Sequence, residues 1–375
     1  MPQKTIIIDD AIPYAKAMFS HLGAIKLMPG RDIDANAVQQ ADALIVRSRT
    51  QVNAALLENS QIKFVGSTVV GLDHIDQAWL KANQIKFYSA QGCNANSVAE
   101  YVISGLFDIA EQQQIDLKDC TLGIVGVGHV GKLLQQKAKI LGIKTLLNDP
   151  PRARLEGEAA FCSLDELLLK SDIISLHTPL TKTGQDASYH LLNAHNLAHL
   201  KPNAILVNAA RGGIIDEQAW LKITNKANII DCWQNEPKIN ESLYHKADIA
   251  TAHIAGHSLE AKVAGSEMVY QQLCQFWQVP AQSDWKSLLP ASPPPLTQPD
   301  TDNLQSALHQ IFRQTYDLRA DDQAIRSTDI HQVHNQFETH RRHYPIHREW
   351  AQHRIEKSTH NHLNDILTKL GFMLY

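Results

Sequence analysis

Residues 121–131 read TLGIVGVGHVG, and this stretch decides the fold. Its first five residues form an apolar run typical of a buried strand, and a Gly-x-Gly-x-x-Gly pattern follows at once, before a predicted helix. Glycines in such a turn allow a tight bend, a close approach of the backbone to a pyrophosphate, and packing of helix against strand. The helix N-terminus offers free N–H groups and the positive end of its dipole to phosphate oxygens. The stretch therefore predicts a dinucleotide site with contacts at Gly126, Gly128, His129, Val130 and Gly131.

Asp149 closes the next predicted strand, 18 residues after Gly131. A carboxylate at this spacing is typical of a group that binds the ribose hydroxyls. It would repel a 2′-phosphate, so the sequence predicts NAD and not NADP as the cofactor. Two alternatives stay open: Arg152 and Arg154 could meet a 2′-phosphate if their loop folded back, and Asp149 could be a turn residue before two prolines.

Short apolar runs alternate with helical patterns along the first 280 residues, which indicates parallel sheets covered by helices on both faces. The chain of 375 residues is long enough for two or three domains of about 100–200 residues each. The predicted fold class is α/β, with two doubly wound parallel-sheet domains, one of them a Rossmann domain, and a smaller C-terminal α+β domain. Strands are predicted at residues 5–8, 43–46, 62–66 and 85–88, and then at 121–125, 144–147, 172–176, 204–208, 228–231 and 248–251.

Helix signals and prolines set the predicted domain boundaries. Ser97 with Glu100, and Ser163 with Glu166, match the capping-box pattern at a helix start. Residues 290–299 hold five of the fifteen prolines, which predicts an extended linker that joins neither helix nor sheet ladder. The predicted domains are a substrate domain at 1–95 with a return helix at 258–283, an NAD-binding domain at 96–257, and a dimerisation domain at 286–375.

Composition excludes several classes of protein. The chain has 35 Lys and Arg against 39 Asp and Glu, a formal charge of −4, so no basic field favours nucleic acid or anionic lipid. No run of about 18 apolar residues occurs, which predicts no membrane span. The five cysteines are far apart and form no CxxC pair, which is typical of reduced, buried thiols in a cytoplasmic protein.

Three ionisable residues lie at predicted strand ends or in the loops beyond them: Arg211 in NAARGGIID, Glu236 in DCWQNEP and His253 in ATAHIAGH. Hydride transfer from a hydroxy acid needs a cation for the carboxylate, a proton carrier, and a group that tunes that carrier. Taken singly, Arg211 could cap a turn, Glu236 could be a loop acid, and His253 could be structural. Together, at the carboxyl edge of a parallel sheet, they favour catalysis. His74 and His177 are interpreted as structural.

The motifs GVGHVG, HTPL, NAARGG, DCWQNEP and HIAG, in this order, resemble the NAD-dependent D-2-hydroxyacid dehydrogenase family over about residues 1–280. The segments FVGSTVVGLDHID, QGCNANSVAEYV and DPPRAR, and a tail with YDLRADD, are similar to the branch of that family that acts on erythronate 4-phosphate. The resemblance implies NAD-dependent oxidation of 4-phospho-D-erythronate to the 2-oxo acid phosphate, in the biosynthesis of pyridoxal phosphate. It also implies a homodimer formed through the C-terminal domain.

The resemblance assigns roles residue by residue. Arg211 matches the substrate-orienting arginine, Glu236 the acid that pairs with the histidine, and His253 the acid/base. Ser48 matches a substrate contact, whereas Val69 stands where that branch usually has threonine and His257 where it has a tyrosine. Asp149 matches the ribose-binding acid, and the other cofactor contacts carried over are Thr178, Ala209, Ala210, Asp231 and Gly256.

The phosphate of such a substrate needs cations or N–H groups away from the reacting carbon. Arg47, Ser48 and Arg49 end a predicted strand, and Thr50 is a predicted N-cap of the following helix, so two guanidinium groups and helix N–H groups would lie close together. The alternative is that the two arginines form surface ion pairs. Backbone N–H groups near Val70 and Gly71 are predicted to hold the carboxylate together with Arg211.

Two rival functions remain at this point. One is a 3-phosphoglycerate or other D-2-hydroxyacid dehydrogenase, and the other is a non-catalytic NAD(H)-sensing binding protein. The presence of Arg211, Glu236 and His253 together favours an enzyme, because a sensor needs only the cofactor site. The histidine-rich tail is not interpreted as a metal site, because Pro345 interrupts its helix and no cysteine completes a ligand set; a solvated face or a dimer contact is expected for His331, His334, His340, His343 and His347.

Overall fold

The computed structural model describes residues 4–326 and 332–375, so His331 lies outside the described residues. The chain forms two compact units: Met1–Asn94 with Leu259–Ala291, and Ala95–Ser258 with Ser292–Tyr375. The C-terminal segment thus groups with the second unit, and the predicted boundary at residue 286 stays a prediction. Within the described residues, no helix has both the length and the apolar character needed to cross a membrane.

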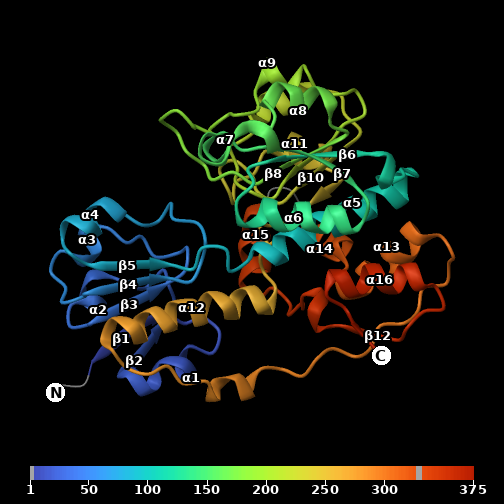
Figure 1. The fold of residues 1–375 in the computed structure, drawn as a ribbon. Helices are drawn as coiled ribbons and strands as arrows, with labels where there is room; N and C mark the ends of the chain where they lie inside the picture. The colour runs from blue at the N-terminus through green and yellow to red at the C-terminus, as the bar shows by residue number, and fades with distance from the viewer. Residues whose placement is uncertain (1–3, 327–331) are drawn as a thin grey trace. The chain divides into compact units, whose positions relative to one another are not determined.

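The first unit holds a parallel sheet of five strands in the order β2-β1-β3-β4-β5 (Figure 1). Strand β2 is not among the predicted strands, because this edge strand is half exposed and lacks a continuous apolar run. The strands are β1 (Thr5–Asp9), β2 (Ala24–Met28), β3 (Ala43–Val46), β4 (Phe64–Ser67) and β5 (Lys86–Ser89). The helices are α1 (Ala15–Phe19), α2 (Ala35–Val38), α3 (Ala54–Leu57), α4 (Gln77–Ala82) and α12 (Leu259–Trp277), with 3₁₀ turns η1 (Ser20–Leu22) and η4 (Asp284–Leu288).

Alternate residues of these strands face two separate cores. Ile6, Ile8 and Phe64 pack in one cluster with Val269 and Tyr270 of α12. The intervening residues Ile7, Leu44 and Val65 pack in the other cluster with the side chains of α2, α3 and α4. Because a strand points successive side chains to opposite faces, a strand buried on both faces is apolar throughout. The return helix predicted at residues 258–283 therefore closes one face of the first sheet.

The second unit holds six parallel strands in the order β11-β10-β9-β8-β6-β7. The chain moves outward from β6 to β7 and then returns to the other side of β6 as β8, so the sheet changes winding direction between β6 and β8. Ligands of such sheets bind beyond the carboxyl ends of the strands at this switch point. The strands are β6 (Thr121–Val125), β7 (Lys144–Asn148), β8 (Ile173–Leu176), β9 (Ile205–Asn208), β10 (Ala227–Ile230) and β11 (Ile249–Ala250).

Helices cover this second sheet, and the predicted fold class is confirmed. They are α5 (Ala95–Gln113), α6 (His129–Ile140), α7 (Pro150–Glu156), α8 (Leu164–Lys170), α9 (Ala194–Leu197), α10 (Glu217–Lys222) and α11 (Glu241–Lys246), with 3₁₀ turns η2 (Leu117–Asp119) and η3 (Glu158–Ala160). The predicted cap of α8 is confirmed, since the Ser163 hydroxyl accepts a hydrogen bond of 3.1 Å from the Glu166 N–H.

The predicted cap of α5 is wrong. This helix begins at Ala95, so Ser97 and Glu100 lie inside it. The Ser97 hydroxyl donates to the Ala255 carbonyl at 2.8 Å, and Glu100 accepts from the Lys137 ammonium at 3.2 Å. Burial raises the pKa of Glu100 to about 7, despite the nearby lysine. The Ser-x-x-Glu pattern serves tertiary contacts here and not a helix end.

The C-terminal segment is mainly helical and shares a core with α5. Phe312 stacks on Trp350 with ring centroids 4.4 Å apart and meets Phe107 of α5 edge-on at 5.0 Å. Its elements are α13 (Leu304–Thr315), α14 (Leu318–Arg326), α15 (Val333–Arg342), 3₁₀ turn η6 (Trp350–Gln352), α16 (Asn361–Leu370), and the parallel pair β12 (Arg354–Ile355) and β13 (Met373–Leu374).

The proline-rich stretch takes part in this small sheet, contrary to prediction. Leu296 lies between prolines and keeps its N–H, which donates to the Arg354 carbonyl at 2.7 Å in an isolated bridge. Two tail histidines also differ from the predicted solvated face. His340 lies 3.1 Å from the buried carboxylate of Asp321, and His347 stacks on Tyr316 at 4.4 Å between ring centroids.

Candidate active site

The glycine turn after β6 has the geometry that its sequence predicts. Gly126 has a φ of +88°, and a Cβ there would lie 2.7 Å from the His177 carbonyl carbon. A Cβ on Gly131 would lie 2.2 Å from the Gly126 carbonyl oxygen, so α6 starts against the turn itself. A Cβ on Gly128, the N-cap of α6, would meet no atom within 4 Å. The turn is therefore closed toward the protein at two glycines and open at the third, where a ligand can approach the backbone.

Asp149 stands beside this turn at the end of β7. Its Oδ2 accepts a hydrogen bond from the Val127 N–H at 2.8 Å, and its Oδ1 accepts one from the Arg152 N–H at 3.0 Å, which caps α7. The residue therefore does fill the turn role that the sequence left open. The bond from the Val127 N–H also fixes the carboxylate against the glycine turn.

A cavity of about 890 Å³ opens at the switch point of the second sheet. Its size is within the range of small-molecule sites, about 300–1,000 Å³. The hydroxyl of Thr178 is buried in its wall, and no described residue is a hydrogen-bond partner for it. Residues from each surrounding element line it, among them Gly126, Gly128, Asp149, Ser163, Thr178 and Leu191. These residues fit a dinucleotide.

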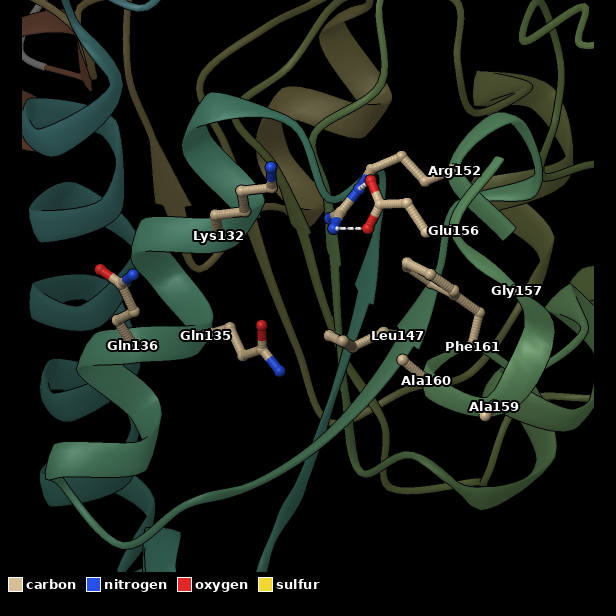
Figure 2. Close-up of a pocket in the computed structure, with 10 residues that line it drawn as sticks. All are labelled: Lys132, Gln135, Gln136, Leu147, Arg152, Glu156, Gly157, Ala159, Ala160 and Phe161. Carbon is tan, nitrogen blue, oxygen red and sulfur yellow. Dashed lines mark hydrogen bonds and ion pairs between the residues drawn. The ribbon is translucent and has the colours of Figure 1, made fainter. Parts of the chain in front are cut away.

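The two arginines after Asp149 are engaged by carboxylates of the chain itself. Arg152 donates to both oxygens of Glu156 at 2.7 and 2.6 Å and to the Val127 carbonyl at 2.7 Å. Figure 2 shows this pair above a smaller hollow of about 400 Å³ beside α6. Arg154 donates to Asp186 at 2.5 Å. Neither arginine presents its full fork to a 2′-phosphate, which favours NAD.

His253 and Glu236 form a directly bonded pair. The Nδ1 atom of His253 lies 2.8 Å from Oε2 and 3.1 Å from Oε1 of Glu236, and the Trp233 N–H donates to Oε1 at 2.9 Å. Burial raises the pKa of Glu236, but the charge and hydrogen bond of His253, the charge of Arg341 and the Trp233 N–H together outweigh burial, so this pKa lies below its usual value. Nδ1 is thus committed to a carboxylate. The other ring nitrogen, Nε2, has no hydrogen bond to a described residue.

Asp231 holds the loop that carries His253. Its Oδ1 accepts from the Ile254 N–H and from the Thr251 hydroxyl, both at 2.7 Å, and its Oδ2 accepts from the Ala255 N–H at 3.1 Å. His253 itself has a φ of +54°, a left-handed conformation that costs energy for a residue with a side chain. These bonds position the loop of His253, and the cofactor contact predicted for Asp231 stays a prediction.

Arg211 lies on the turn after β9 together with Ala209 and Ala210. The Asn208 amide donates to the Arg211 carbonyl at 2.9 Å and to the Cys232 carbonyl at 3.2 Å, which joins this turn to the loop that leads to Glu236. A Cβ on Gly212 would lie 1.9 Å from the Trp233 carbonyl oxygen, so only glycine permits this contact. The structure therefore brings the loops of Arg211, Glu236 and His253 to one edge of the sheet.

Cys232 adds a thiol to this cluster, with ligand atoms of Cys232, Glu236 and His253 all within 4.8 Å of one another. Burial, reinforced by the charges of Asp231 and Glu236, raises the pKa of the Cys232 thiol well above its ordinary value. The thiol donates to the Ala210 carbonyl at 3.4 Å. The Cys232 side chain therefore packs beside the His253–Glu236 pair as a buried thiol that is hydrogen-bonded to the Arg211 turn.

His177 and His257 of the second unit have structural contacts, whereas His74 lies in the first unit. Burial lowers the pKa of His177 to about 3 and that of His74 to about 4, so both are neutral, and His177 Nε2 bonds the Ser175 hydroxyl at 2.8 Å. His257, which follows Gly256, donates its N–H to the Ile254 carbonyl at 2.8 Å. Its ring packs edge-on against Tyr344 of the C-terminal segment at 5.5 Å.

In the first unit, the helix cap predicted beside Arg47 is wrong. The Thr50 hydroxyl donates to the Gly30 carbonyl at 2.8 Å, and α3 begins at Ala54 with Asn53 as its N-cap. No helix N-terminus therefore adds N–H groups next to Arg47, Ser48 and Arg49. In the loop after β4, the Val69 carbonyl accepts from the Ser89 hydroxyl at 3.3 Å and the Val70 carbonyl from the Gln91 amide at 2.8 Å, which fixes the segment that leads to Gly71.

Lys262 of α12 is a buried cation that is not among the predicted site residues. A Cβ on Gly265, one turn further along, would lie 2.3 Å from the Thr68 carbonyl oxygen, so α12 runs closely over the loop after β4. Burial, together with the charge of Arg47, lowers the pKa of Lys262 to about 8. Arg47 also opposes the rise that burial causes in the pKa of Asp9. Arg47 and Lys262 therefore lie within electrostatic reach of each other at the carboxyl edge of the first sheet, beside Asp9.

Comparisons with known proteins agree with this geometry. Residues 94–255 match the family model described as D-isomer specific 2-hydroxyacid dehydrogenase, NAD binding domain, and residues 288–371 match a domain of unknown function, DUF3410. The erythronate-4-phosphate dehydrogenase of Hydrogenovibrio crunogenus is 57% identical over 373 residues, which cover 100% of this chain and 99% of the relative. That of Ruthia magnifica is 48% identical, over 92% of this chain and 96% of the relative. The structure of the TT0316 protein from Thermus thermophilus covers 74% of this chain and 99% of its own, with a TM-score of 0.65 and 22% identity, so it supports the fold alone.

Proposed function

This chain belongs to the erythronate-4-phosphate dehydrogenase family, and we propose that it oxidises 4-phospho-D-erythronate to the 2-oxo acid phosphate with NAD. We further propose that this reaction serves the formation of pyridoxal phosphate. The observation that carries the proposal is the bonded pair of His253 and Glu236 at one sheet edge with the Arg211 turn, in the unit that contains the NAD-binding domain. The resemblance to the D-2-hydroxyacid dehydrogenases is thereby confirmed at the level of the family.

The proton transfer follows from the two ends of the His253 ring. Neutral His253 accepts the C2 hydroxyl proton at Nε2 as the C2–O bond becomes a carbonyl. NAD, which the glycine turn and Asp149 would hold, would supply the acceptor for the C2 hydride. Glu236 at Nδ1 stabilises the imidazolium that forms and holds the ring in place. Asp231 fixes the loop, so the ring does not need to reorganise during the reaction.

The proposed substrate carries two anionic groups, a carboxylate and a phosphate. We assign the substrate carboxylate to Arg211, which a guanidinium fork can bind through two hydrogen bonds. Arg47, Ser48 and Lys262 in the first unit form a second anion site, and the loop of Val69, Val70 and Gly71 lies beneath α12 at the same sheet edge. His257 takes the place that the resemblance gives to a substrate-contacting tyrosine.

An NADH absorbance assay with several acids separates this function from its rivals. The enzyme is mixed with NAD and, in separate reactions, with 4-phosphoerythronate, erythronate, 3-phosphoglycerate or D-lactate. The proposal expects the highest kcat/KM for 4-phosphoerythronate. Preference for 3-phosphoglycerate would favour the other dehydrogenase, and NADH binding without turnover of any acid would favour a sensor.

We also propose a homodimer in the cytoplasm, with residues from about 286 onward supplying much of the contact. Apolar side chains of this segment are exposed, including Leu288, Ile346 and Tyr375, with 58%, 72% and 59% of their surface accessible. Such side chains are often covered in an oligomer, and twofold dimers are the commonest oligomers. Five free cysteines support a reducing compartment.

A further inference from the structure

Arg341 lies in the last turn of α15. The contacts of helix α14 fix the position of that turn. Helix α14 docks on the edge strand β11, where the Asp322 carboxylate accepts from the Ala250 N–H at 2.7 Å. The neighbouring Asp321 is buried and faces the other way, toward the tail. Because β11 runs directly into the loop of His253, α14 ties the C-terminal segment to the catalytic loop.

The residues on both sides of Arg341 are bonded to Asp321. His340 Nε2 lies 3.1 Å from Asp321 Oδ1, and the Tyr344 hydroxyl donates to Oδ2 at 2.6 Å. The Tyr344 ring packs against His257, four residues after His253. Two anchored neighbours thus hold Arg341 at the catalytic end of the second unit, although 88 residues of chain separate it from His253.

The charge of Arg341 acts on the catalytic cluster. It lowers the pKa of Glu236 and opposes the rise in the pKa of Cys232, so the guanidinium lies within electrostatic reach of both. Its Nε atom is buried, and within residues 4–326 and 332–375 that atom has no hydrogen-bond partner. By contrast, Arg319 and Arg326 on α14 each pair with a carboxylate. A buried donor left without a partner is costly, so this arginine is suited to an anion that arrives with a ligand.

The substrate offers two anionic groups to such a donor. With the carboxylate assigned to Arg211, the phosphate, for which Arg47, Ser48 and Lys262 are also proposed, is the group left for Arg341, and a guanidinium fork matches phosphate oxygens. We propose that Arg341, in the segment that matches the domain of unknown function, binds the substrate phosphate and contributes to the choice of a phosphorylated acid. This inference rests on the proposed function, because it names a further residue for the same substrate.

The test compares Arg341→Gln with Arg342→Gln, its exposed neighbour on the same helix. For Arg341→Gln, kcat/KM for 4-phosphoerythronate should fall by about 10- to 100-fold, the usual range for a lost charged hydrogen bond, while that for unphosphorylated erythronate stays within a few-fold. Calorimetric titration of Arg341→Gln with inorganic phosphate should show a loss of phosphate affinity of similar size. Arg341→Lys, which keeps the charge without the fork, should fall between the two, and Arg342→Gln should match wild type.

The outcomes separate this inference from the proposed function. Equal losses for both acids would mean that Arg341 acts on Glu236 and not on phosphate, and would overturn the inference. Unchanged kcat/KM and unchanged phosphate binding in Arg341→Gln would also overturn it, with the proposed function intact. A wild-type enzyme without preference for the phosphorylated acid would overturn the proposed function and this inference with it. Thermal melting of each variant shows whether a loss of activity comes from misfolding. If Arg341→Gln is misfolded, Arg341→Lys is compared with wild type in its place.

Discussion

The Nδ1 atom of His253 lies 2.8 Å from Oε2 of Glu236, and this contact orients the whole site. It commits one ring nitrogen to a carboxylate, so proton exchange with substrate falls to Nε2. The low pKa of Glu236 keeps this partner ionised at neutral pH, when the imidazolium forms. An ionised partner that is already in place stabilises the developing charge without reorganisation.

Replacement of His253 by alanine should remove the proton acceptor and leave the cofactor site intact. We expect kcat to fall by about 10²–10⁴-fold, the usual contribution of a general acid/base. Binding of NADH, followed by its fluorescence, should change by no more than a few-fold, because the glycine turn and Asp149 are far along the chain and untouched. Full activity in His253→Ala would contradict the assignment.

Glu236→Gln keeps a hydrogen-bond partner for Nδ1 and removes its charge. The imidazolium then loses its stabilising carboxylate, so kcat should fall by about 10- to 100-fold. The matched control is Glu217→Gln, a buried acid that bonds the Gln234 N–H at 2.7 Å and not His253. If Glu236→Gln kept the wild-type kcat, as Glu217→Gln should, the pairing would have no catalytic role.

Affinity for a phosphorylated acid should depend on pH through Lys262. Its pKa is about 8, so the side chain is cationic below that pH and neutral above it. The KM for 4-phosphoerythronate should therefore rise as pH increases through and beyond 8, with bound phosphate shifting the midpoint upward. Lys262→Met should raise KM at pH 7 and flatten this dependence, whereas the exposed Lys26→Met should leave it unchanged. A pH dependence that persists in Lys262→Met would exclude this lysine.

Deletion of the C-terminal segment should destroy both the proposed dimer and the solubility of the remainder. Phe312 and Trp350 pack with Phe107 of α5, so a chain that ends near residue 283 exposes an apolar helix face. Light scattering should show aggregation or a monomer. A soluble, fully dimeric truncation would place the dimer contact elsewhere in the chain.

Strands of the fold were predictable where burial on both faces makes them apolar throughout. The six strands of the second sheet were placed to within about two residues for this reason. The edge strand β2 is not predictable from the sequence, because its half-exposed residues form no continuous apolar run. The helix caps predicted at Ser97 and Thr50 are wrong for the same reason. The Ser97 hydroxyl bonds the Ala255 carbonyl and the Thr50 hydroxyl bonds the Gly30 carbonyl, and no local sequence pattern reveals such distant partners.

The candidate site divides in the same way. Gly126, Glu236 and His253 occur in motifs whose spacing carries the chemistry, so the sequence indicates them directly. The proposed phosphate-binding roles of Lys262 and Arg341 depend on tertiary packing. Lys262 is placed by the packing of α12 on the first sheet, and Arg341 by its neighbour His340, which bonds Asp321. In the sequence each therefore appears as an ordinary polar residue of an amphipathic helix.

The central claim is that this chain oxidises a phosphorylated four-carbon 2-hydroxy acid with NAD. The most direct measurement is the initial rate of NADH formation by the wild-type enzyme with 4-phosphoerythronate and with erythronate, each over a range of concentrations. The account predicts turnover with 4-phosphoerythronate and a kcat/KM for it that is at least about 10-fold above that for erythronate, the value of one charged contact. Equal kcat/KM for the two acids, or no NADH with either, would contradict it.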